Sequence, residues 1–134
     1  MTITRDDMFA PLIEAFPEFQ ERLQEFEAEW AHNWEKRPYY SLLADLVIAC
    51  SELLRSKRDA ELPAIFSVVE RWIIEGDRYV SEAAIVGFLE DLQNSNMHRQ
   101  TTPADFERFL LPQSRRWWHK LDRFWNHREP LNDD

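Results

Sequence analysis

The four histidines, which are the most versatile side chains for metal binding and proton transfer, are scattered along this chain. None of His32, His98, His119 and His127 has a partner four residues away with a third ligand close by. Zinc sites need nitrogen, sulfur or carboxylate ligands clustered at such spacings. The sequence therefore predicts no metal site. His119 and the following Lys120 are expected to face solvent.

Nucleophilic catalysis has no recognisable basis either. Cys50 is the only cysteine, so it cannot form an intrachain disulfide, and its neighbours are apolar. A thiol in such surroundings is inert rather than activated. Ser41, Ser51 and Ser67 lie in no known nucleophile motif.

Two adjacent carboxylates, Glu90 and Asp91, are the remaining candidates for acid–base chemistry. Adjacent residues point about 100° apart on a helix, which makes them a poor catalytic pair. Solvation at a helix end or contact with a partner fits them better. The chain also has only two glycines and no phosphate-binding loop. We therefore predict no enzyme activity and no cofactor.

A stripe of acidic residues follows the second expected helix, over about residues 18–35. At 100° per residue, one side carries Phe16, Phe19, Leu23, Phe26, Trp30 and Trp34. The opposite side carries Glu14, Glu18, Glu21, Glu25 and Glu29, with only Arg22 near them. An ordinary solvated face is one interpretation. Contact with a positively charged partner is the other, because like charges four residues apart destabilise a helix.

The third expected helix, about residues 39–56, carries Asp45 at the edge of its apolar face. A carboxylate there forms either a local salt bridge or a partner contact, since buried charges need partners. The candidate partner-binding residues are thus all acidic: Glu18, Glu21, Glu25, Glu29, Asp45, Glu90 and Asp91.

The overall charge argues against a nucleic-acid partner. The chain has 25 acidic and 16 basic residues and a net charge of -9, which suits a basic protein partner. Basic residues do surround Trp117, Trp118 and Trp125, as in single-strand binders. Residues 99–134 nevertheless carry a local net charge of only +1. We therefore expect these tryptophans to belong to the core.

The helical elements that hold these residues are organised around residues 79–92, YVSEAAIVGFLEDL. Its seven residues from Ala83 to Leu89 carry no polar side chain, so every side of this segment must be covered by protein. A buried strand is possible by periodicity alone, but the alanine pair and the helical patterns on both sides favour a helix. Gly87 predicts close approach of a neighbouring helix.

The 134 residues predict one all-α domain of about six to seven helices, as a compact HEAT-like stack or a bundle. It comprises an acidic helical part at about 4–35 and a second part at about 38–125. Gly76 and Asp77 should separate two tightly joined helices, and Ser114 should cap the last helix.

No apolar stretch reaches 18 residues, and the first residues show no basic region followed by an apolar one. The sequence therefore predicts neither a membrane span nor a secretory signal. We expect a cytoplasmic protein.

Two stretches, EGDRYVSEAAIVGFLEDLQN and FERFLLPQSRRWWHKLDRFW, carry a family resemblance over roughly residues 38–125. They resemble a bacterial family of small helical proteins, a domain of unknown function, that includes immunity proteins of polymorphic toxin systems. The resemblance implies binding to one cognate toxin and carries no catalytic meaning. The first 35 residues lie outside this resemblance.

Two functions follow as expectations. The first is an immunity protein that neutralises a cognate, cytoplasm-acting toxin by stoichiometric binding. We expect the toxin to present a basic surface, so that complementary charge speeds their encounter. The second is a HEAT-like adaptor without a toxin partner. The sequence leaves open whether the acidic stripe or the family-like segment forms the interface.

Overall fold

The computed structural model describes residues 2–98 and 100–131, and this part of the chain is all-α. Its α-helices are α1 (Phe9–Ala15), α2 (Gln20–Trp30), α3 (Tyr39–Arg55), α4 (Leu62–Glu75), α5 (Arg78–Glu82), α6 (Glu90–Gln93) and α7 (Pro112–His127). Short 3-10 turns cover residues 17–19, 31–36, 59–61, 95–97 and 103–109. Among the described residues no strand forms, and the predicted fold class is confirmed.

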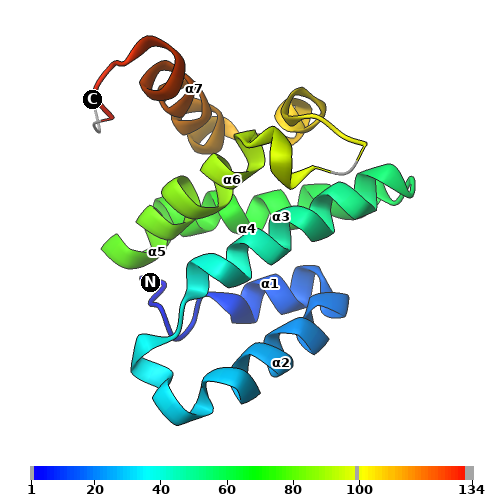
Figure 1. Cartoon of the computed structure of the whole chain (residues 1–134), viewed down its shortest axis with the longest axis vertical. Helices are drawn as coiled ribbons and strands as arrows, with labels where there is room; N and C mark the ends of the chain where they lie inside the picture. The colour runs from blue at the N-terminus through cyan, green and yellow to red at the C-terminus, as the bar shows by residue number, and fades with distance from the viewer. Residues whose placement is uncertain (1, 99, 132–134) are drawn as a thin grey trace.

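The segment expected to be the central helix is a helix that other elements surround. α5, a π-helical segment (Ala83–Leu89) and α6 follow one another without a break. Every residue of the π-helical segment except Val86 is buried. α3, α4 and α7 all contact it. Figure 1 shows α1 and α2 at one end of the molecule and α7 at the other, with the remaining long helices between them.

At Gly87 the central helix and α3 approach each other closely. A Cβ atom at Gly87 would lie 3.1 Å from Leu43 Cδ1 and 3.9 Å from the ring of Tyr40. Contact at 3.1 Å is tighter than normal carbon–carbon packing. The missing side chain therefore lets α3 pack directly on the central helix, as its position in an apolar run predicts.

The turn between α4 and α5 is held from both sides. Asp77 caps α5, because its Oδ1 accepts a hydrogen bond of 2.9 Å from Val80 N. The N-terminal segment crosses the same turn: Ile3 N donates to Glu75 O at 2.8 Å, and Asp77 N donates to Ile3 O at 2.9 Å. Gly76 is needed here because a Cβ would collide with the Trp72 carbonyl.

The second helix is shorter than the expected 18–35. Regular α-helix ends at Trp30, and Asn33, with φ -151° and ψ 59°, breaks the following 3-10 turn. This break turns Trp34 toward Phe26 and Tyr39, whose rings it meets edge-on. The inward stripe is nevertheless correct, since its six apolar members are buried or half-buried.

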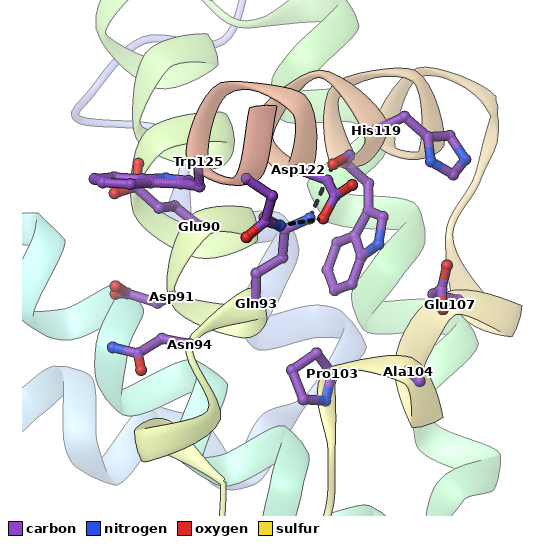
Figure 2. Close-up of a pocket in the computed structure, with 12 residues that line it drawn as sticks. Glu90, Asp91, Gln93, Asn94, Pro103, Ala104, Glu107, His119, Asp122 and Trp125 are labelled. Carbon is purple, nitrogen blue, oxygen red and sulfur yellow. Dashed lines mark hydrogen bonds between the residues drawn. The ribbon is translucent and has the colours of Figure 1, made fainter. Parts of the chain in front are cut away.

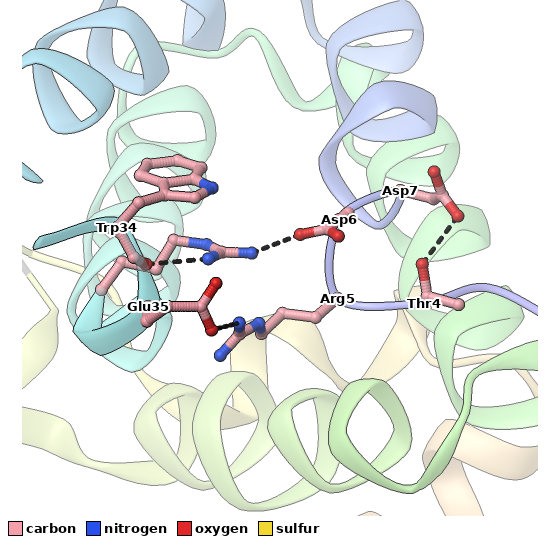
Figure 3. Close-up of polar contacts among 7 residues, drawn as sticks. Thr4, Arg5, Asp6, Asp7, Trp34 and Glu35 are labelled. Atoms are coloured by element: carbon pink, nitrogen blue, oxygen red, sulfur yellow. Dashed lines mark hydrogen bonds and ion pairs between the residues drawn. The ribbon is translucent and has the colours of Figure 1, made fainter. Parts of the chain in front are cut away.

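A buried arginine joins the N-terminal segment to this break (Figure 3). The guanidinium of Arg37 lies over the rings of Trp34 and Tyr39, at 4.2 and 4.8 Å from their centroids. It donates to Trp34 O at 2.8 Å and to Asp6 Oδ1 at 2.5 Å. The aromatic faces and the carboxylate together offset the cost of burying its charge.

The start of the last helix differs from the expected serine cap. α7 begins at Pro112, and Ser114 lies inside its first turn. The cap comes instead from α4: Glu70 Oε2 accepts from Gln113 N, and Glu70 Oε1 accepts from both the amide and the hydroxyl of Ser114, all at 2.8 Å. A buried carboxylate satisfies these first-turn amides, which have no partner within the helix, more strongly than a serine hydroxyl would.

Two further expectations for α7 are wrong. Lys120 is buried rather than solvent-facing. Its ammonium lies 5.0 Å from the centroid of the Trp117 ring, at a distance typical of a cation–π contact. Trp125 is 59% exposed and does not belong to the core, whereas Trp118 is buried. α7 packs with one side only, so the broad aromatic face seen in the sequence extends past the buried part.

Candidate partner-binding pocket

A pocket of about 720 Å³ opens between the end of the central helix, the 103–109 turn and α7 (Figure 2). Its lining comes from these three regions and the loop after α6: Glu90, Asp91, Gln93, Asn94, Pro103, Ala104, Glu107, Trp118, His119, Asp122, Trp125 and Asn126. The side-chain amide of Gln93 donates to Trp118 O at 2.8 Å and ties α6 to α7 at its edge.

The pocket is acidic. Glu90, Asp91, Glu107 and Asp122 contribute carboxylates, and His119 is the only basic one among the described residues of the lining. None of the four carboxylates forms an ion pair with another of the described residues. Asp122 accepts one hydrogen bond of 2.6 Å from the amide of Asn126. The pocket therefore holds negative charge that the described part of the chain leaves unbalanced.

The pKa values of two of these carboxylates, Glu90 and Asp91, are raised. Burial raises the pKa of Asp91. Burial, and then the neighbouring Asp91 carboxylate, raise the pKa of Glu90. Both effects disfavour the ionised forms, because charge loses solvation and meets like charge. A cation close to these carboxylates would oppose both effects, because it favours the ionised forms.

Tryptophan forms part of the pocket wall. The indole of Trp125 is largely exposed, and its ring meets that of Phe124 edge-on at 5.2 Å between centroids. Trp118 contributes from a buried position on the same side of α7. An indole face next to carboxylates suits a guanidinium or ammonium group, which can make a cation–π contact and an ion pair together.

The acidic stripe lies elsewhere, on α2 and the turn before it. Glu18, Glu21, Glu25 and Glu29 are all exposed. Glu18 pairs with Arg58, and Glu29 pairs with Arg22 at 3.3 Å. Glu21 and Glu25 form no ion pair within the described part of the chain.

Asp45 belongs with the stripe rather than with the pocket. Its Oδ2 accepts a 2.7 Å hydrogen bond from Arg22 Nε, so it forms the local salt bridge that was one of its two interpretations. Arg22 thereby links α2 to α3. The candidate residues thus divide into two groups: one around α2, at one end of the molecule (Figure 1), and the pair Glu90 and Asp91 on α6, in the pocket beside α7.

The sequence matches the family described as Domain of unknown function (DUF7674) over residues 9–126. The chain belongs to the DUF7674 family. No curated protein and no solved structure matches it.

The region shared with the DUF7674 family contains both acidic groups. The match begins at α1, so it includes the acidic helix that the resemblance over 38–125 left out. It also contains every residue that lines the pocket. Both surfaces are therefore part of the family domain.

In this member of the DUF7674 family, the cysteine and one histidine that could take part in chemistry are buried or already hydrogen-bonded. Cys50 is buried, and burial raises the pKa of its thiol, which keeps it protonated. His98 sits in a closed network, with its ring nitrogens 2.9 Å from Thr101 Oγ1 and 2.7 Å from Leu92 O. No three potential ligands among the described residues form a metal-binding group. None of the described helices is long and apolar enough to cross a bilayer.

Sequence reasoning identified Glu90 and Asp91 but missed Glu107, Asp122 and Trp125. A partial signal was present, because Trp118, Asp122 and Trp125 lie four and three residues apart and so share one side of a helix. From the sequence, the tryptophans on that side are expected to belong to the core, so the side is not predicted to line a pocket. The contribution of Glu107 could not be read from the sequence, since it depends on how the 103–109 turn packs beside α7.

Proposed function

We propose that this protein is an immunity protein that binds a cognate bacterial toxin acting in the cytoplasm and neutralises it by stoichiometric protein–protein binding. The resemblance to a family that includes such proteins supports this function. So does the net charge of -9, which suits a partner with a basic surface.

The observation that carries the proposal is the acidic pocket with its exposed tryptophan. Four carboxylates that form no ion pair with another described residue surround a cavity large enough for a long side chain. We assign it to an arginine or lysine side chain of the toxin. Such a buried, paired anchor is a typical centre of a tight interface.

The stripe has a different role in this proposal. Glu21 and Glu25 are exposed and unpaired in the described part of the chain, so their field extends into solvent. Exposed charges chiefly raise the rate of encounter. In the proposal the stripe steers the toxin and the pocket holds it.

The test begins with a search for a toxin gene next to the gene of this chain, followed by co-expression of the two products. The immunity function predicts that the two co-purify in a fixed ratio and that cells expressing both survive. A HEAT-like adaptor would bind a partner without protecting the cell from it.

A matched pair of charge reversals then tests the pocket. Asp122→Lys and Glu27→Lys each change an exposed acidic helix residue by the same charge, but only Asp122 lines the pocket. We expect Asp122→Lys to weaken toxin binding at least tenfold, which is about 1.4 kcal/mol, and to restore toxicity. Glu27→Lys should do neither. Equal affinities for the two variants would exclude the pocket as the contact.

A further inference from the structure

Two walls of the acidic pocket come from segments that are joined in the chain by one short loop. The first wall is the end of the central helix, with Asp91, and the loop after it, with Asn94. The second is the 103–109 turn, with Ala104. Figure 2 shows them as two separate segments near α7. The chain passes from one to the other through the loop that contains His98, so the contacts of this loop bear on how the two walls are placed.

The ring of His98 contacts groups on both of these walls. Its Nε2 lies 2.7 Å from the carbonyl oxygen of Leu92 in α6, and its Nδ1 lies 2.9 Å from Thr101 Oγ1. The ring also packs against the buried ring of Phe106 in the turn, with 5.4 Å between their centroids. Thr101 Oγ1 lies 2.6 Å from Ser51 Oγ on α3. One imidazole therefore joins the two walls, and Thr101 joins them to α3.

The Leu92 carbonyl fixes the direction of the other hydrogen bonds in this network. A carbonyl oxygen can only accept, so the hydrogen must lie on Nε2 of His98. In a neutral ring Nδ1 is then an acceptor, and the Thr101 hydroxyl donates to it. Because that hydroxyl has only one hydrogen, Ser51 must donate to Thr101. The geometry thus requires the Nε2–H tautomer of His98.

The loop that these hydrogen bonds hold has an unfavourable backbone conformation. Gln100, the residue before Thr101, has φ 64°, in the left-handed region that residues other than glycine rarely adopt. Such a conformation persists only where surrounding contacts hold it. The hydrogen bonds from Thr101 to His98 and from Ser51 to Thr101 are contacts of this kind.

We propose that His98 is a positioning residue for the acidic pocket. As the Nε2–H tautomer, it forms a latch with Thr101 that holds the 103–109 turn against the end of α6 and thereby sets the separation of the two walls. The latch itself does not depend on the identity of any partner. Its effect on toxin binding rests on the proposed immunity function.

Nitrogen-15 NMR of the histidine rings at about pH 8, where an imidazole is ordinarily neutral, tests the tautomer. His98 should carry its hydrogen on Nε2, and this hydrogen should exchange with water more slowly than the ring hydrogen of His119. The ring of His119 is exposed and forms no hydrogen bond with another described residue. A hydrogen on Nδ1 of His98, or equally fast exchange in the two rings, would overturn the proposal.

Two variants then remove the latch and keep the shape of the loop. His98→Phe retains a ring beside Phe106 but loses both hydrogen bonds, and Thr101→Val loses only the hydroxyl. The amides of Asp105 and Leu110 hydrogen-bond within the turn and should exchange about tenfold faster in either variant, as expected for the loss of one or two hydrogen bonds. Exchange in α4, which contributes no residue to the latch, should not change. Wild-type exchange of the turn in both variants, or an equal increase in every helix, would contradict the latch.

Binding of the toxin found in the co-expression experiment completes the test. His98→Phe should weaken binding by at least about tenfold without changing the net charge, because a binding site needs its supporting contacts. The matched control is His127→Phe, which replaces an exposed histidine of α7 outside the pocket lining and should have no effect. Faster exchange in the turn with unchanged toxin affinity would support the latch and exclude the pocket as the contact. Weaker binding with wild-type exchange would instead overturn the latch.

Discussion

At the scale of single residues, the chain shows how the absence of a side chain can be as specific as its presence. Gly87 lies in the middle of a helix, where glycine costs roughly 1 kcal/mol relative to alanine. The cost is offset because α3 approaches to a distance that leaves 3.1 Å between a Cβ there and Leu43 Cδ1. The residue is thus selected by a tertiary contact against its helical preference.

Gly87→Leu should lower the free energy of unfolding by about 1–3 kcal/mol, because four further carbon atoms must fit against α3. Denaturant unfolding measures the change. Gly87→Ala is the graded control: its gain in helix propensity opposes a tight contact with the flexible end of Leu43, so its effect should be much smaller. An unchanged stability of Gly87→Leu would mean that this side of the helix is open.

At the scale of secondary-structure elements, α7 depends on a residue that belongs to another helix. Glu70, in the middle of α4, accepts hydrogen bonds from two amides in the first turn of α7. Its charge also lies at the positive end of the helix dipole. Because α7 provides one wall of the acidic pocket, this contact helps to position the pocket.

Glu70→Gln should destabilise the protein by about 1.5–3 kcal/mol, the range for hydrogen bonds to a buried charged group. Hydrogen exchange should become faster in the first turn of α7 before it does so in α3. Glu75→Gln, which removes a carboxylate from an exposed pair with Arg71 on the same helix, should cost less than 1 kcal/mol. Similar losses in the two variants would argue against Glu70 as the cap of α7.

At the scale of the whole molecule, the acidic residues form two separate surfaces with different physical character. The α2 stripe is exposed, so salt screens it beyond about 10 Å at 0.1 M. The pocket is partly enclosed, and its carboxylates interact with a partner at short range. The two surfaces should therefore act on different steps of association.

If the proposed toxin is the partner, Glu21→Lys with Glu25→Lys should slow its association and flatten the dependence of the association rate on salt, with little change in the dissociation rate. Stopped-flow measurements at two salt concentrations test this. If the stripe is only a solvated face, association will match the wild type at both, and the fold should gain slightly as like charges separate. Asp122→Lys should instead raise the dissociation rate, since it removes a short-range contact.

The sequence alone determined the helical class, the central helix, the buried stripe of α2 and the close approach at Gly87. These features depend on the periodicity of apolar residues and on local backbone preferences. Both are set by residues that are close together in the sequence. The net charge of -9, which is summed from the sequence without a structure, also directed the choice of candidate partner-binding residues to acidic ones.

Only the tertiary structure decided what those residues face. Burial of Arg37 with Asp6 and capping of α7 by Glu70 both join residues more than 30 positions apart. The acidic pocket likewise forms only because the 103–109 turn and α7 pack beside the end of the central helix. Periodicity indicates which side of a helix is buried. Which elements cover that side depends on how the loops direct each helix. Local sequence does not specify that packing.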